Sequence, residues 1–117
     1  MPHRESEKPD RRDLFRGALE MMILRSLERE PMHGYALVQH IKKRSNDRLL
    51  VEEGSLYPAL QRLLKERLLK AEWEMSASNR RVRTYHITPA GKKHLAREMS
   101  SFEQMLQAVA LVLSPEH

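Results

Sequence analysis

One stretch of the chain, residues 52–69, combines side chains that could contact a nucleic acid. If this stretch is helical, its leucines recur at helical spacing and share one face: Leu56, Leu60, Leu63 and Leu64. The other face then presents small, hydroxyl, amide and basic groups, with the tyrosine on its flank: Ser55, Tyr57, Pro58, Gln61, Arg62 and Lys65. Such a helix is suited to lying in a groove of DNA, although an ordinary surface helix has the same pattern.

Three residues predict where this helix starts. Gly54 interrupts whatever precedes it, and Ser55 can accept hydrogen bonds from the first free backbone N–H groups. Pro58 is tolerated in a first turn, where its missing N–H would have had no partner. We therefore expect the helix to begin at Ser55.

Basic residues concentrate around this helix and the segment after it. The 117 residues contain 21 Lys and Arg against 16 Asp and Glu, a net charge of +5. Residues 62–93 include nine basic and three acidic side chains, a net +6, so the remainder sums to −1. This concentration is typical of a protein that binds a polyanion, and a solvated basic face is the alternative.

Other chemistries find little support in the sequence. The absence of cysteine excludes disulfides, thiolate nucleophiles and Cys-ligated zinc. His33 and His40 are two helical turns apart, too far to share one ion, and there is no HExxH pattern. No glycine-rich phosphate loop is present, and Glu52 and Glu53 are more simply linker carboxylates than an acid–base pair. We expect no catalytic residue, no metal site and no cofactor.

Two further helices are predicted before residues 52–69. Asp13 is expected to cap a helix from Leu14 to about Arg29, which Pro31 ends. Because this helix is apolar on nearly all sides, it must be covered on more than one side. A second helix is predicted over residues 34–45, and residues 48–52 form a short extended link to the third. Three helices with tight connections indicate a helix-turn-helix whose third helix reads DNA.

A two-stranded ribbon is predicted directly after the third helix. Apolar and polar side chains alternate over residues 69–75, as in a half-buried strand, and we expect Trp73 in the core. Residues 76–80 form a polar turn, and β-branched and aromatic residues predict a second strand over residues 81–87. Arg80 and Arg81 lie at the tip, with Arg83 behind them. A ribbon with an arginine tip after a helix-turn-helix indicates a wing.

A long helix is predicted from Pro89, capped by Thr88, to about Leu113. Its apolar residues follow the 4-3 spacing of a short coiled-coil seam: Leu95, Met99, Phe102, Leu106, Val109 and Leu113. We interpret this stripe as an intersubunit seam that Met22 of the first helix joins. A helix packed against its own domain gives a similar stripe.

The chain therefore divides into a flexible N-terminal arm (residues 1–12), a DNA-binding domain (13–88) and a C-terminal dimerisation helix (88–117). The arm lacks the apolar core of a signal peptide, and no apolar run is long enough to cross a membrane. We expect a cytoplasmic, nucleoid-associated protein without a membrane partner.

From about Leu14 to Leu113 the sequence resembles the PadR family of bacterial transcriptional regulators. The motifs of this resemblance are Leu19-Glu20, Pro31-Met32-His33-Gly34-Tyr35, Glu53-Gly54-Ser55-Leu56-Tyr57-Pro58-Ala59-Leu60, Trp73, Tyr85 and Ile87-Thr88-Pro89-Ala90-Gly91. HGY followed by EGSLYPAL in this order and spacing is specific, and the single C-terminal helix resembles the small subfamily. One departure is Arg67, where the family usually has a glycine in left-handed conformation after the third helix, so we expect strain or a different termination there.

The resemblance implies a mainly α fold with a two-stranded β wing: a winged helix-turn-helix plus a long C-terminal dimerisation helix. It also implies a dimeric repressor that binds a pseudo-palindromic operator in double-stranded DNA. Ser55, Tyr57 and Pro58 would then lie near phosphate, while Gln61, Arg62 and Lys65 face the groove. The wing-tip arginines would reach the backbone or the minor groove: Arg80 and Arg81, with Arg83 behind.

Two questions about partners stay open at this point. Small relatives bind planar drugs between the dimer helices, which leaves an aromatic or drug-like effector open here. Those relatives use a tryptophan on the last helix, and this last helix has none. The alternative function is a winged-helix module that binds another protein, without specific DNA binding.

Overall fold

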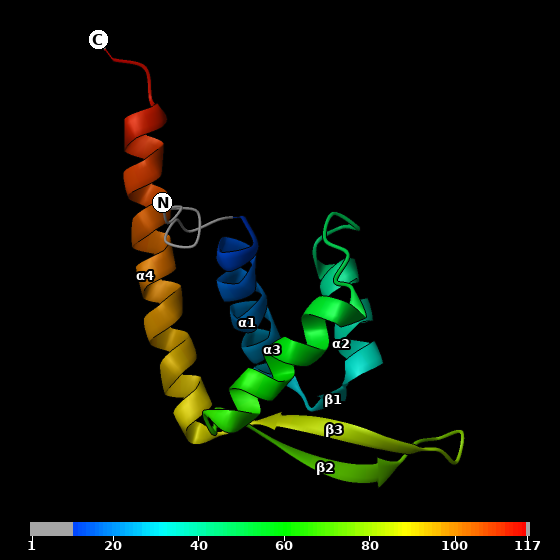
Figure 1. The fold of residues 1–117 in the computed structure, drawn as a ribbon. Helices are drawn as coiled ribbons and strands as arrows, with labels where there is room; N and C mark the ends of the chain where they lie inside the picture. Colours follow the sequence, from blue (N-terminus) through cyan, green and yellow to red (C-terminus); the bar gives the residue numbers. More distant parts are fainter. Residues whose placement is uncertain (1–10, 117) are drawn as a thin grey trace, which may run out of the picture.

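The structure is a computed structural model that describes the backbone of residues 11–116 and the side chains of residues 17–116. In chain order the elements are α1 (Arg11–Arg29), β1 (Met32–His33), α2 (Gly34–Arg44), α3 (Glu53–Lys65), β2 (Leu69–Met75), β3 (Arg81–Ile87) and α4 (Pro89–Leu113), as Figure 1 shows. The arm predicted over residues 1–12 lies outside the described residues up to position 10, and positions 11 and 12 belong to α1.

Helix α1 is the centre of the core. It packs against α2, α3, α4 and β3, as its nearly all-round apolar sequence predicts. Its buried side chains pack against leucines of the other helices and against residues of the strands. The largest fully buried side chains of this core are Leu19, Ile23, Leu24, Leu37, Leu60, Leu63 and Leu95. The winged-helix class predicted from the sequence is therefore confirmed.

The sheet has three strands in the order β1-β3-β2, all antiparallel, so the prediction of two strands is incomplete. β1 consists of two residues, and Met32 pairs with Tyr85 while His33 pairs with Thr84. Two residues are too few to show a period along the sequence, which is why alternation could not reveal this strand. α2 begins directly after β1. His33 caps the start of α2, since its Nδ1 atom accepts a hydrogen bond of 3.4 Å from the Ala36 N–H.

Two helices begin earlier than predicted. Because α1 starts at Arg11, Asp13 lies inside it and is not its cap. α3 starts at Glu53, and the carbonyl of Glu52 accepts from the N–H groups of Ser55 and Leu56 at 3.0 and 2.9 Å. Ser55 is therefore the third residue of α3, and the N-cap Glu52 makes no side-chain capping bond. Both predicted caps were wrong.

Pro58 is the sixth residue of α3, so its predicted place in the first turn was also wrong. At this position the proline removes the N–H that would bind the carbonyl four residues earlier. That carbonyl belongs to Gly54, which is exposed. Water can therefore bind the carbonyl that the proline leaves without a backbone donor.

A tight corner joins α3, β2 and α4. Arg67 adopts a φ of 63°, and the N–H groups of Arg67 and Leu68 bind the carbonyls of Leu64 and Leu63 at 3.0 and 2.9 Å. These two bonds form a Schellman motif around a left-handed residue, which here is an arginine in place of the usual glycine. The strain expected at this position is present, since a side chain in the left-handed region is unfavourable by about 1–2 kcal/mol.

The start of α4 is built onto this corner. The hydroxyl of Thr88 accepts from the Gly91 N–H at 3.0 Å and donates to the Arg67 carbonyl at 2.8 Å, while the Thr88 N–H binds the Leu68 carbonyl at 3.1 Å. A Cβ atom on Gly91 would overlap the Leu68 carbonyl oxygen and lie 2.8 Å from Ile87. The glycine therefore lets α4 approach the corner closely.

The two halves of α4 have different surroundings. Leu95 is 2% exposed in the core, although the predicted seam places it between subunits. Met99 is partly buried against the same core, as is Met22 of α1. The second half extends beyond the other described elements (Figure 1) and exposes large apolar side chains: Phe102, Met105, Leu106, Val109, Leu111, Val112 and Leu113. No helix among the described residues is long and apolar enough to span a bilayer.

Candidate nucleic-acid interface

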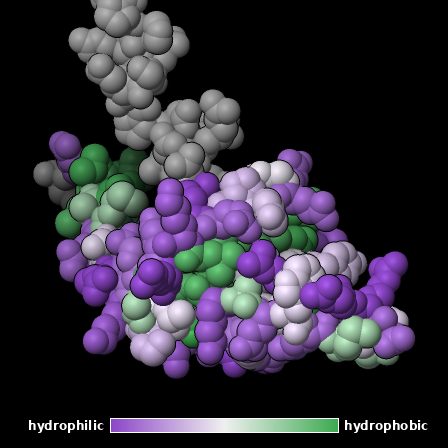
Figure 2. Space-filling view, turned by 60° about the horizontal axis from the view of Figure 1, so that its bottom comes forward, coloured by the Kyte–Doolittle hydropathy of each residue, from purple (hydrophilic) through white to green (hydrophobic). Residues whose placement is uncertain are grey.

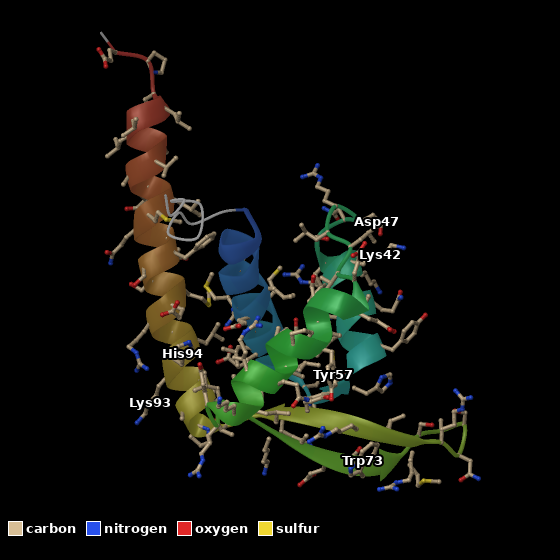
Figure 3. The ribbon with its side chains drawn as sticks, viewed as in Figure 1. Lys42, Asp47, Tyr57, Trp73, Lys93 and His94 are labelled. Carbon is tan, nitrogen blue, oxygen red and sulfur yellow. The ribbon has the colours of Figure 1, made fainter. Side chains whose placement is uncertain are left out.

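The solvent-facing side of α3 differs in part from the predicted one. Leu56, Leu60 and Leu63 of the predicted leucine face are buried and Leu64 is partly buried, and Ala59 is buried beside them. Tyr57, Pro58 and Lys65 are exposed, while Ser55, Gln61 and Arg62 are only partly so. Tyr57, with 58% of its surface exposed, is labelled in Figure 3. The exposed face therefore carries a phenol, a proline ring and an ammonium group, with the amide and the guanidinium set deeper.

Arg62 is held at the edge of this face by α1. Its Nε atom donates to the Oε2 atom of Glu20 at 2.6 Å, and both side chains are largely covered. An Nε–H bond fixes the direction of the guanidinium plane and leaves its Nη groups as further donors. Gln61, one residue earlier, has a buried amide nitrogen without a hydrogen-bond partner among the described residues. The two residues predicted to reach base edges are thus partly built into the fold.

The wing contradicts the prediction that Trp73 lies in the core. Leu69 is buried and Ala71 partly buried, but Trp73 and Met75 are each 59% exposed. Alternation along β2 does place these four side chains on one face. The ribbon extends past the helices (Figure 1), so nothing among the described residues covers that face in its outer half. Figure 3 shows Trp73 on this outer part of β2.

The side chains next to Trp73 are arginines, not core residues. The cross-strand pairs Trp73–Arg83 and Met75–Arg81 put both arginines on the same face as the indole. The guanidinium carbon of Arg81 lies 4.7 Å from the centre of the Trp73 ring, and that of Arg83 lies 6.0 Å from it. A guanidinium at this range over an indole is a cation–π contact. These contacts hold positive charge flat against the ribbon.

The same row continues to α3 through Tyr85. Arg83 lies 5.9 Å from the Tyr85 ring. Burial raises the pKa of the Tyr85 hydroxyl, the charge of Arg83 opposes this rise, and the neighbouring Tyr57 adds to it. We call the set formed by Tyr57, Tyr85, Arg83, Trp73 and Arg81 the arginine–aromatic row. Tyr85 itself is 4% exposed, so the row reaches solvent through Tyr57 on α3 and through Trp73, Arg81 and the partly exposed Arg83 on the wing. Figure 2 shows that the side of the molecule bearing the wing is largely hydrophilic.

Arg80 lies apart from the row, in the turn. The turn is closed by a hydrogen bond of 2.7 Å from the Ser76 N–H to the Arg80 carbonyl, and Asn79 adopts a φ of 63° there. The hydroxyl of Ser76 accepts from the Arg80 N–H at 3.2 Å. Arg80 is therefore an exposed cation at the end of the wing, as predicted from its position.

The opposite face of the wing has a different character. Alternation along β2 and β3 puts Glu72, Glu74 and His86 on that face, away from the arginine–aromatic row. The two strands therefore largely separate charge: the arginines and aromatic rings lie on one face, and the carboxylates and the imidazole lie on the other, together with Lys70. A polyanion would be attracted to the first face and repelled by the second.

Comparison with known proteins identifies the family. The family model described as the transcriptional regulator PadR-like family matches residues 23–97. The chain belongs to this family. The match spans α2, α3, both strands of the wing and the start of α4. It therefore confirms the resemblance drawn from the HGY and EGSLYPAL motifs.

Individual transcriptional regulators are similar to this chain over most of its length. A transcriptional regulator of Mycobacterium tuberculosis is 31% identical over 98 residues, which are 84% of this chain and 88% of that protein. The crystal structure of a PadR-like transcriptional regulator from Bacillus cereus is similar with a TM-score of 0.75 at 31% identity, covering 88% of this chain and 98% of that one. A transcriptional regulator from Clostridium thermocellum shares the fold, with a TM-score of 0.80 at 24% identity over 87% and 99% of the two chains.

Proposed function

We propose that this PadR-like chain is a dimeric repressor that binds a pseudo-palindromic operator, with α3 in the major groove and the wing along the neighbouring backbone. The observation that supports the proposal best is the arginine–aromatic row, which continues the exposed face of α3 onto the wing. It gives one cationic surface on which a duplex can lie. Such a repressor would act in the cytoplasm, at the nucleoid.

In this proposal the residues of α3 divide into two kinds. Ser55 lies in the first turn of α3 and Tyr57 and Pro58 in the next, and the hydroxyl groups of Ser55 and Tyr57 can donate to phosphate and fix the register while Pro58 borders them. Gln61 and Lys65 continue the same side. The exposed Lys65 ammonium can contact base edges in the major groove, and Gln61, whose amide nitrogen is buried in the free protein, would turn outward to do so. Arg62 would contribute through its Nη groups while its Nε–H stays bound to Glu20.

The wing arginines would act on the backbone. Arg81 and Arg83 are fixed against Trp73, so little side-chain freedom is lost when they meet phosphate. Arg80 at the tip is free to follow the backbone or enter the minor groove. Contacts of this kind carry affinity with little sequence preference.

Dimerisation would use the exposed half of α4. A stripe formed by Phe102, Leu106, Val109 and Leu113 is a large apolar surface for a single chain to leave in water. A second copy of α4 would cover it, and Met99 would border the contact. Twofold symmetry then predicts two half-sites with centres about 10 bp apart, or a multiple of that spacing.

The experiment that tests this function is selection of a duplex from a random pool, followed by binding and footprinting. We expect a pseudo-palindrome bound with a Kd of about 10⁻⁸ to 10⁻¹⁰ M at physiological salt, and much more weakly as salt rises. Failure to enrich any sequence, together with salt-independent binding, would favour the alternative of a winged-helix module that binds protein.

Relief by a small molecule is the second part of the proposal. A cavity of about 590 Å³ lies between α1 and α2, in the size range of ligand sites. Its apolar lining residues are Met22 and Ile41, and its basic lining residues are Arg25, Arg29, His40 and Arg44. Because Arg25 already binds Glu28 at 2.7 Å, the other basic groups remain for an acidic aromatic or drug-like effector.

A screen of such compounds for release from the operator tests the effector. A true effector lowers operator affinity while sedimentation still shows a dimer. Replacement of His40 by Gln at the cavity wall should weaken the response, and Gln39→His on the exposed side of α2 should leave it unchanged. If no acidic aromatic compound in the screen changes the affinity, this cavity is not an effector site.

A further inference from the structure

The acidic face of the wing holds three groups of metal-ligating type close together. The Nε2 atom of His86 on β3 lies 3.3 Å from Oε1 of Glu72 and 3.9 Å from Oε2 of Glu74, both on β2. One ligand atom from each residue lies within 4.8 Å of the other two. The three side chains come from two paired strands, so the antiparallel ladder fixes their spacing.

The spacing of these atoms is close to the spacing of the ligands around a bound ion. Around a tetrahedral ion with bonds of about 2.1 Å, neighbouring ligand atoms are about 3.4 Å apart. The two measured distances from His86 fall near this value, and rotation about the glutamate side-chain bonds can supply the remainder. No hydrogen bond is formed across either distance.

The surroundings of the His86 Nε2 atom agree with this spacing. The atom is covered by protein atoms and has no hydrogen-bond partner among the described residues, while the side chain as a whole is 23% exposed and a Glu72 carboxylate oxygen lies 3.3 Å away. A buried polar atom without a hydrogen bond costs about 1–3 kcal/mol, and an ion bound between His86 and the carboxylates would remove that cost. Glu72 and Glu74 are each about half exposed, at 54% and 49%, so an ion can enter from solvent.

The charges on this face set the sign of the ligand. Two carboxylates lie beside an imidazole, and no lysine or arginine forms an ion pair with either of them among the described residues. Lys70 is the basic group on the same face, directly across from His86 in the ladder, and Thr84 is the neutral neighbour across from Glu72. A divalent cation would neutralise the two carboxylates.

We propose that Glu72, Glu74 and His86 form a binding site for a divalent transition-metal ion of the Zn²⁺ class. An imidazole nitrogen with two carboxylate oxygens favours such an ion over Mg²⁺ or Ca²⁺, which prefer oxygen ligands throughout. Three protein ligands leave at least one position for water. The site joins β2 to β3 on the face turned away from the arginine–aromatic row, so an ion bound there does not obstruct that row.

Calorimetric titration of the full-length, tag-free protein with ZnCl₂ in the absence of DNA tests the site. We expect saturable binding of one ion per chain and a rise in Tm with zinc, since the ion binds the folded wing. The same concentration of Mg²⁺ should produce neither effect. Because no DNA is present, the result is independent of whether the proposed operator binding is correct.

Three variants locate the ion. His86→Gln, and separately Glu72→Gln with Glu74→Gln, should weaken zinc affinity at least about tenfold, since even outer-shell partners of a metal contribute that much. His94→Gln on α4 removes one histidine outside the cluster and should bind zinc as the unchanged protein does. Circular dichroism checks that each variant is folded. Absence of saturable zinc binding, or equal affinity in His86→Gln and the unchanged protein, would overturn the proposal.

Discussion

Two exposed surfaces of this molecule differ in the kind of side chain that they expose to water. The arginine–aromatic row between α3 and the wing combines guanidinium groups with aromatic rings, and each cation is fixed by a ring beneath it. The outer half of α4 exposes aliphatic side chains and Phe102 with almost no fixed charge among them. Exposure alone does not separate the two, but charge does: the first surface suits a polyanion, and the second suits another apolar surface.

The largest effect on dimerisation and operator binding is expected from a charge placed on the apolar surface of α4. Leu106 is 50% exposed, and a carboxylate there would be buried without a partner in a dimer, which is unfavourable by several kcal/mol. We expect Leu106→Glu to be monomeric by sedimentation, or to unfold. At about 1.4 kcal/mol per tenfold, operator binding should fall on the order of a thousandfold.

The control is Gln107→Glu, which adds the same charge to the next residue of α4 and should remain a dimer. Joining two Leu106→Glu chains with a flexible tether should restore specific binding. A Leu106→Glu protein that stays dimeric and binds its operator normally would show that the two copies meet elsewhere.

The next largest effect is expected on stability, at the tight corner that joins α3, β2 and α4. Because a Cβ on Gly91 would overlap the Leu68 carbonyl, Gly91→Ala must displace α4 from the turn between α3 and β2. We expect a loss of about 1–3 kcal/mol in the free energy of unfolding, measured by urea denaturation. Gly17→Ala is the matched control, since nothing lies within 4 Å of its added Cβ in α1, and it should gain about 0.5–1 kcal/mol. Equal effects of the two substitutions would contradict the close approach.

Variants at Arg62 and Glu20 test whether the DNA-binding surface extends from the arginine–aromatic row onto α3. Arg62→Ala should relax base preference at one operator position by about 1–3 kcal/mol. Glu20→Gln keeps the guanidinium charge and weakens its anchor, so it should lower the ratio of specific to non-specific affinity in the same direction. If Arg62 only stabilises the fold, both variants will lower Tm and leave that ratio unchanged.

The smallest change in stability should come from the strained residue between the two surfaces. Arg67→Gly removes a Cβ from the left-handed region and should raise the free energy of unfolding by about 1 kcal/mol. Arg67→Ala removes the same charge but keeps the strain, so it should not stabilise the protein. If Arg67→Ala raised the free energy of unfolding as much as Arg67→Gly does, the loss of the arginine charge would explain the stabilisation.

The elements predicted best from the sequence are those with local signals. Alternation predicted β2 and β-branched and aromatic residues predicted β3, both with the observed bounds, and Thr88 followed by Pro89 predicted the start of α4. Signals that depend on a distant partner were missed. β1 is defined only by its pairing with β3, and the anchor of Arg62 lies 42 residues away in the sequence.

Trp73 shows a second kind of limit. Alternation predicts which face of a strand a side chain occupies, and it does so correctly for Trp73. It does not predict whether another element covers that face, and the wing extends beyond the helices. The arginines paired across from positions 73 and 75 were the available signal, because charged cross-strand neighbours are unusual beside a core tryptophan.

The most direct test of the central claim is the salt dependence of operator binding with and without the wing arginines of the row. Each phosphate contact contributes about 0.9 to the slope of log Kd against log salt concentration. If the row lies on DNA, the Arg81→Ala, Arg83→Ala double variant should lose about 0.9 in slope for each arginine removed from the complex, and all sequences should be weakened alike. An unchanged slope and affinity in a folded double variant would contradict the assignment of this surface to DNA.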